Sequence, residues 1–170
     1  AFVCRELAGN LCDFIEARGF ELHRLPIETT SWIADRDGPP HARWLGASWQ
    51  EDARQFHEVT KTLPRPDWIV VDHYGLDGRW EERVRVTGTK ILVIDDLADR
   101  PHDCDLLLDQ NLVAGMSERY VGRAPAKCSL LLGPTYALLQ EPYARYRPRT
   151  PPREGKVRRL WISFGGFDSG

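Results

Sequence analysis

The sequence predicts an α/β fold with a Rossmann-like, mostly parallel sheet. Short apolar runs rich in β-formers alternate with segments whose apolar residues recur at helical spacing. Polar residues follow several of these runs directly, as at the carboxyl ends of buried parallel strands. The predicted strands cover residues 2–4, 20–25, 68–71, 90–94, 104–109, 129–132 and 159–163.

Size, charge and cysteine content limit the class of protein. The 170 residues suffice for a domain with a real core, and the net charge of -2 argues against binding to a nucleic-acid backbone. No run approaches the ~18 apolar residues of a membrane helix, and no signal peptide is visible. The four cysteines form no C-x-x-C pair, so we expect free thiols and a cytoplasmic location.

The N-terminal part is expected to begin with a strand, a helix and a second strand. Asn10 can cap the helix, whose apolar residues Leu11, Phe14 and Ile15 fall on one face. The period-two alternation of residues 20–25 predicts a half-buried strand. Residues 26–47 read as a loop, and a loop of this length is either functional or disordered.

Two helices are expected on either side of the run at 68–71. Ser48 and Glu51 form a capping-box pattern that opens a helix to about Leu63. Asp77 stands where it would cap a second helix. Between them, Trp68–Val71 is typical of a strand buried on both faces.

The C-terminal part predicts a helix over 136–146 and then a linker. Residues 147–157 are rich in Pro and Arg and poor in apolar residues. We therefore expect a domain at 1–146, a linker at 147–157, and the first strand and glycine turn of a second domain at 158–170. The first residue is not Met and the last residues lie inside a glycine turn, so we expect a fragment of a longer protein.

The candidate site residues follow the predicted strands, whose carboxyl ends share one edge. The Tyr74 phenol either donates to a sugar or phosphate oxygen or packs over its loop. His73 is a general base or, as we favour, a structural hydrogen bonder. Asp72, Asp95 and Asp96 bind Mg²⁺ or, as we favour, cap helices and loop amides.

Four motifs, taken together and in order, resemble a known family. They are DWIVVDHYGLD at 67–77, ILVIDDLADRPHDCDLLLDQN at 91–111, LLGPTYALLQEPYA at 131–144 and LWISFGGFDSG at 160–170. The set is similar to the pseudaminic-acid pathway hydrolases of UDP-2,4-diacetamido-2,4,6-trideoxy-β-L-altropyranose, and to spore-coat polysaccharide biosynthesis proteins. The resemblance covers residues 2–25 and 67–170, and the loop at 26–47 takes no part in it.

The resemblance implies a GT-B-like fold of two domains with a UDP-sugar in the cleft between them. Water would displace UDP from the anomeric carbon, without a metal or other cofactor. Tyr74 would line the sugar pocket, and Tyr136, Ala137 and Leu138 would lie in the same cleft. Gly165, Gly166 and Asp168 would begin the nucleotide-binding domain, although Phe167 replaces the family's small hydroxyl residue there, and Gln140 replaces a basic one.

The family's glycine-rich G-x-G-H-x-x-R turn, whose histidine is thought to activate the water, is not found in these residues. The resemblance implies that this turn lies upstream of Ala1, together with the first strand and helix. We therefore expect the 170-residue chain alone to be marginally stable and inactive. Two other functions stay open: a GT-B glycosyltransferase that passes the sugar to an acceptor, and a non-catalytic α/β binding module.

Overall fold

A computed structural model describes residues 1–28, 33, 36–152 and 154–160. The chain divides into two compact units, Ala1–Ala137 and Leu138–Gly170. The domain boundaries expected from the sequence remain predictions. Of the predicted strand at 159–163 only residues 159 and 160 are described, and neither is in a strand.

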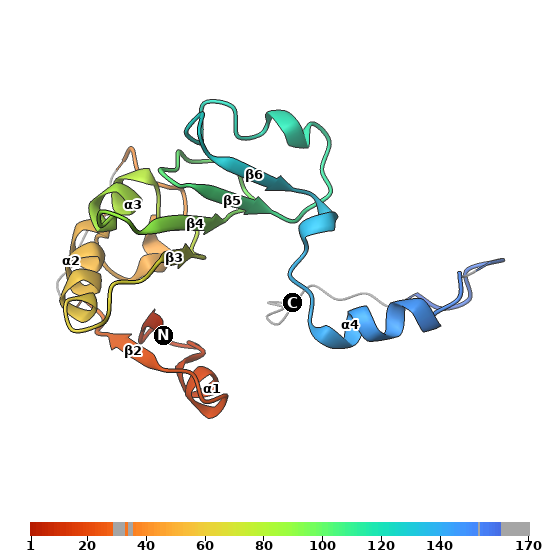
Figure 1. Cartoon of the computed structure of the whole chain (residues 1–170), viewed down its shortest axis with the longest axis horizontal. Coiled ribbons are helices and arrows are strands. Elements are labelled where there is room, and N and C mark those ends of the chain that lie inside the picture. The colour runs from red at the N-terminus through yellow and green to blue at the C-terminus, as the bar shows by residue number, and fades with distance from the viewer. Residues whose placement is uncertain (29–32, 34–35, 153, 161–170) are drawn as a thin grey trace. The chain divides into compact units, whose positions relative to one another are not determined.

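The first unit carries two parallel sheets, which confirms the predicted Rossmann-like α/β class. β1 (Phe2–Arg5) pairs with β2 (Leu22–Leu25). The larger sheet has four strands in sequence order, as Figure 1 shows. They are β3 (Trp68–Val71), β4 (Lys90–Ile94), β5 (Leu106–Asp109) and β6 (Ser129–Leu132).

Short helices connect these strands. The α-helices of the described chain are α1 (Cys12–Ala17), α2 (Trp49–Thr60), α3 (Gly78–Val84) and α4 (Glu141–Tyr146). The 3₁₀ helices are η1 (Ala42–Leu45), η2 (Met116–Glu118), η3 (Pro134–Tyr136) and η4 (Arg147–Arg149).

The predicted caps of α2 and α3 are confirmed. Ser48 Oγ accepts from the Glu51 amide at 3.2 Å, and Asp77 Oδ1 accepts from the Arg79 amide at 3.0 Å. In a capping box the Ser48 amide would donate to Glu51, but here it donates to Glu28 Oε2 at 3.1 Å. A residue of the preceding loop therefore completes the cap of α2.

The main core cluster lies on one face of the larger sheet, although Leu108 of β5 is buried on the other. Ile69, Val71, Ile91 and Val93 are at most 8% exposed and pack in one cluster with Trp80 of α3. The prediction that β3 is buried on both faces is wrong, because Trp68 and Val70 are 42% and 59% exposed. Side chains alternate along a strand, and the helices cover only the face that carries Ile69 and Val71.

Two predicted helices also differ from the structure. In α1 only Cys12 is buried, and Phe14 is 53% exposed. Leu11, which precedes the helix, is 66% exposed, so the predicted apolar face is not covered in the described chain. The predicted helix over 136–146 is interrupted between η3 and α4. Pro142 is tolerated in the first turn of α4 but not in a helix interior.

Candidate functional site

The carboxyl ends of β3 and β4 bring Tyr74 and Asp96 together. The Tyr74 hydroxyl donates to Asp96 Oδ1 at 2.8 Å. Asp96 Oδ2 accepts from Asn111 Nδ2 at 3.0 Å, and the Asp96 carbonyl accepts from Arg119 at 2.6 Å. Asp96, in the loop after β4, is therefore held by residues that follow β3 and β5.

The pairing with Asp96 determines the ionisation of Tyr74. The hydrogen bond, followed by partial burial and the carboxylate charge, raises the pKa of Tyr74 to about 12. The phenol thus keeps its proton at neutral pH and donates it in the hydrogen bond to Asp96. Its oxygen keeps lone pairs with which it can accept a hydrogen bond from a ligand.

His73 and Asp72 lie at the same edge but point into different surroundings. His73 Nδ1 accepts from the Gly75 amide at 2.9 Å, and burial lowers the pKa of His73. Asp72 is exposed, although partial desolvation raises its pKa. His73 thus makes the kind of structural hydrogen bond that we favoured from the sequence.

The loop before α2 covers the Tyr74 ring. The Tyr74 ring centroid lies 5.9 Å from that of His41 and 6.1 Å from that of Trp44. Gly75 permits this approach, because a Cβ there would lie 3.0 Å from the His41 carbonyl oxygen and 3.0 Å from a His73 ring carbon. The sequence motifs did not single out His41 or Trp44, since the loop lies outside the resemblance.

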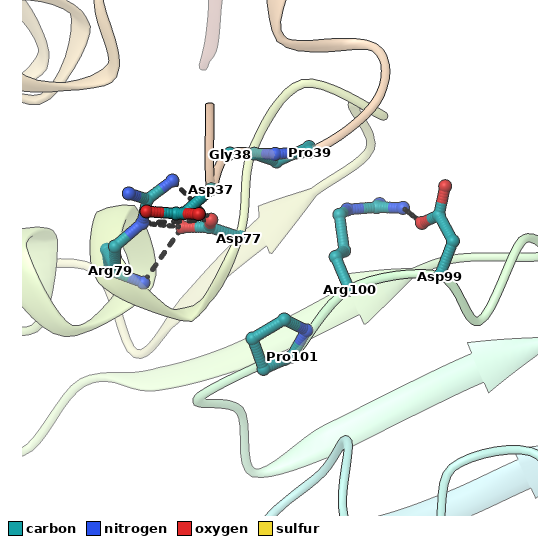
Figure 2. Close-up of a pocket in the computed structure, with 8 residues that line it drawn as sticks. All are labelled: Asp37, Gly38, Pro39, Asp77, Arg79, Asp99, Arg100 and Pro101. Atoms are coloured by element: carbon teal, nitrogen blue, oxygen red, sulfur yellow. Dashed lines mark hydrogen bonds and ion pairs between the residues drawn. The ribbon is translucent and has the colours of Figure 1, made fainter. Parts of the chain in front are cut away.

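A polar pocket of about 280 Å³ lies where this loop meets the N-terminus of α3 and the turn after β4. Figure 2 shows Asp37 and Asp77 close to the Arg79 side chain, and Asp99 paired with Arg100. The pocket is lined by Asp37, Gly38, Pro39, Asp77, Arg79, Asp99, Arg100 and Pro101. Its charged groups are mostly paired within the protein.

Asp95 belongs to a buried network of hydrogen bonds and ion pairs. It is 1% exposed and accepts from the Ala98 amide at 2.9 Å and from the Tyr120 hydroxyl at 3.1 Å. Its Oδ1 lies 2.8 Å from Arg100, and its Oδ2 lies 3.8 Å from His102 Nε2. Burial alone would raise the pKa of Asp95, but His102 and Arg100 hold it well below its usual range.

Glu81 closes this network from α3 and was not singled out from the sequence. It is fully buried, and its Oε1 lies 2.8 Å from His102 Nδ1. The available signal was its position, because Glu81 falls beside Trp80 and Val84 on the apolar face of its helix. A charged residue there needs a buried partner.

The remaining site candidates lie in η3 and in the chain that follows it. Tyr136 is 45% exposed in η3, and Ala137 follows it half-buried. Leu138 is 65% exposed and opens the second unit. Gly165, Gly166 and Asp168 lie outside the described residues.

The described residues contain no group of three or more His, Cys, Asp or Glu side chains placed to hold a metal ion. None of their helices has the length and apolar character needed to cross a membrane.

The chain was compared with known proteins. No family model matches it. Over 101 residues it is 39% identical to the UDP-2,4-diacetamido-2,4,6-trideoxy-beta-L-altropyranose hydrolase of Campylobacter jejuni subsp. jejuni serotype O:2. The match covers 59% of this chain and 35% of the relative. The resemblance that the motifs indicated, to the hydrolases of this UDP-sugar, is thereby confirmed.

Proposed function

We propose that this chain is part of a cytoplasmic hydrolase that releases UDP from a 2,4-diacetamido-2,4,6-trideoxyhexose. The observation that carries the proposal is the 39% identity over 101 residues to a hydrolase of that name. Water attacks the anomeric carbon, its oxygen stays on the sugar, and UDP leaves with the bonding electron pair. The reaction serves a pathway to nonulosonates of the pseudaminic-acid type.

In this proposal Tyr74 is the residue at the sheet edge that contacts the sugar. Its proton is committed to Asp96, so its oxygen accepts a hydrogen bond from a sugar hydroxyl or an acetamido N–H. The sheet edge that carries Tyr74 is supported by Asp72, His73 and Asp95. The sheet carries this edge at the carboxyl ends of its strands, where α/β proteins bind ligands.

The rest of the active site comes from other segments. Tyr136, Ala137 and Leu138 line the same cleft in a GT-B-like molecule, and Gly165, Gly166 and Asp168 approach the nucleotide from the second domain. The water-activating histidine lies outside the 170 residues, so the chain alone is inactive.

The test follows the oxygen of the water. The full-length product of the gene is incubated with the UDP-sugar in ¹⁸O-labelled water, and UDP and sugar are analysed by mass spectrometry. We expect ¹⁸O on the free sugar and none on UDP. Label in UDP, transfer to an added acceptor in place of water, or full activity of the 170-residue chain alone would overturn the corresponding part of the proposal.

A further inference from the structure

His102 lies between two buried carboxylates. Its Nδ1 is 2.8 Å from Glu81 Oε1 and its Nε2 is 3.8 Å from Asp95 Oδ2. The side chains of His102, Glu81 and Asp95 are at most 1% exposed. The 3.8 Å from Nε2 to Asp95 is within ion-pair range but too long for a hydrogen bond, and Nε2 has no hydrogen-bond partner among the described residues. An imidazolium turns an N–H and a positive charge toward each carboxylate, whereas a neutral imidazole carries one N–H. The geometry therefore suits the charged form of His102.

The charges of the surrounding groups also favour the imidazolium form of His102. Around His102 the network holds four carboxylates and two guanidinium groups: Glu81, Asp95, Asp99, Asp109, Arg100 and Arg119. Without a charge on the imidazole these groups carry two net negative charges, which is unfavourable in a largely buried network. An imidazolium at His102 reduces this excess to one.

Other polar groups near the network already have partners. The Tyr120 hydroxyl lies 3.1 Å from both Asp95 Oδ2 and Asp109 Oδ2. The Asp103 amide donates to Glu81, and its carboxylate pairs with Arg85. The remaining titratable neighbours are paired or neutral: Asp77 with Arg79, and the Cys104 thiol, whose pKa is raised by burial.

The network reaches the surface through the turn from Asp95 to Arg100. Asp95 accepts from the Ala98 amide, and Ala98 has a φ of 51°, a conformation uncommon for a residue with a side chain. Arg100 binds Asp95 and donates to the Leu76 carbonyl at 2.7 Å. Asp96, which accepts from Tyr74, is part of this turn.

We propose that His102 is a positioning residue that acts through Asp95. As an imidazolium it holds the turn from Asp95 to Arg100 in the conformation that keeps Asp96 on the Tyr74 hydroxyl. The inference deepens the proposed function, since it rests on Tyr74 as the sugar contact. The geometric claim itself needs no substrate.

The pH dependence has a definite sign. Burial alone would lower the pKa of His102, but the carboxylates of Asp95 and Glu81 outweigh it and raise the pKa above its ordinary value. The stabilisation by His102 is thus fully present below pH ~6.5, the ordinary value. It is lost as the pH rises through the raised pKa of the folded state.

The experiment is a pH titration of the full-length protein by NMR, with ¹⁵N-labelled histidine and ¹³C-labelled tyrosine. Signals of His102 and Tyr74 are assigned with the variants His102→Gln and Tyr74→Phe. We expect both imidazole nitrogens of His102 to be protonated at pH 7, and the Tyr74 ring signal to shift at the midpoint of His102. In His102→Gln the Tyr74 signal should be displaced at all pH values. It should no longer show the pH-dependent shift that follows the titration of His102.

The matched control is His57→Gln. His57 is on α2, and its Nε2 lies 2.9 Å from the Arg83 carbonyl, so this variant should leave the Tyr74 midpoint unchanged. A neutral His102 at pH 7, or a Tyr74 signal that stays constant while His102 titrates, would overturn the proposal. The wild-type titration decides this even if His102→Gln does not fold. Failure of the hydrolase assay with an intact coupled titration would count against the proposed function alone.

Discussion

At the scale of single residues, the Tyr74–Asp96 pair is the clearest chemical feature of the sheet edge. A hydrogen bond to a carboxylate is stronger than one between neutral groups, so the pair fixes the direction of the phenol. Tyr74 also stands under a loop that carries His41 and Trp44. The phenol oxygen is therefore oriented before any ligand arrives.

We expect Asp96→Asn to lower the pKa of Tyr74 from about 12 towards its ordinary value of ~10. An amide can still accept the hydrogen bond, but it has no charge with which to oppose formation of the phenolate. The phenolate absorbance, measured as the difference from the same protein with Tyr74→Phe, reports the titration. Asp13→Asn is the control, because Asp13 pairs with Arg24 and does not act on Tyr74. An unchanged titration in Asp96→Asn would show that Asp96 does not set this pKa.

At the scale of elements, α2 links several parts of the first unit. Its Asp52 accepts from Arg5 of β1 at 2.6 Å and from Trp80 Nε1 of α3 at 2.8 Å. Phe56 of α2 meets the Trp80 ring edge-on at 5.3 Å. The start of α2 therefore influences how β1, α2 and α3 are held together.

Ser48→Ala should lower the free energy of unfolding by about 1 kcal/mol, because the Glu51 amide loses its acceptor. Ser48→Gly should cost only a few tenths of a kcal/mol, since glycine is itself a favourable N-cap. Urea denaturation of the two variants and the wild type measures both values. Equal losses in the two variants would mean that the Ser48 hydroxyl is not the important group.

At the scale of the whole molecule, β3 leaves apolar side chains exposed on the face of the larger sheet opposite the main core, in the part of the chain that the structure describes. Trp68 and Val70 are exposed on the opposite face of β3. β3 is also an edge strand, because among the described strands it pairs with β4 alone. An exposed apolar strand of this kind favours association between molecules. The second unit contributes no strand among its described residues.

Val70→Lys should reduce self-association of the 170-residue chain and change its free energy of unfolding by no more than ~0.5 kcal/mol. Val71→Lys, one residue further, should cost more than ~4 kcal/mol, because Val71 is 5% exposed in the core. Sedimentation velocity and urea denaturation distinguish the two effects. A large loss of stability in Val70→Lys would show that other residues cover this face.

Local patterns explain which parts of the fold could be predicted. The strand at 129–132 and the caps by Ser48 and Asp77 depend on neighbouring residues, and the structure confirms them. Burial of β3 on both faces was wrongly predicted, because an apolar run does not reveal whether a second layer covers it. The buried role of His102 was missed, since its partners lie 21 and 7 positions away.

The sequence by itself determined the alternation of strands and helices, the polar residues at the strand ends and the resemblance to a hydrolase family. These features are written in short segments whose periodicity and order can be read along the chain. Only the tertiary structure decided which of those polar residues meet. Tyr74 and Asp96 are 22 positions apart, and the parallel pairing of β3 and β4 brings them within 2.8 Å. Hydrogen bonds and ion pairs depend on distance in space, which sequence separation does not specify.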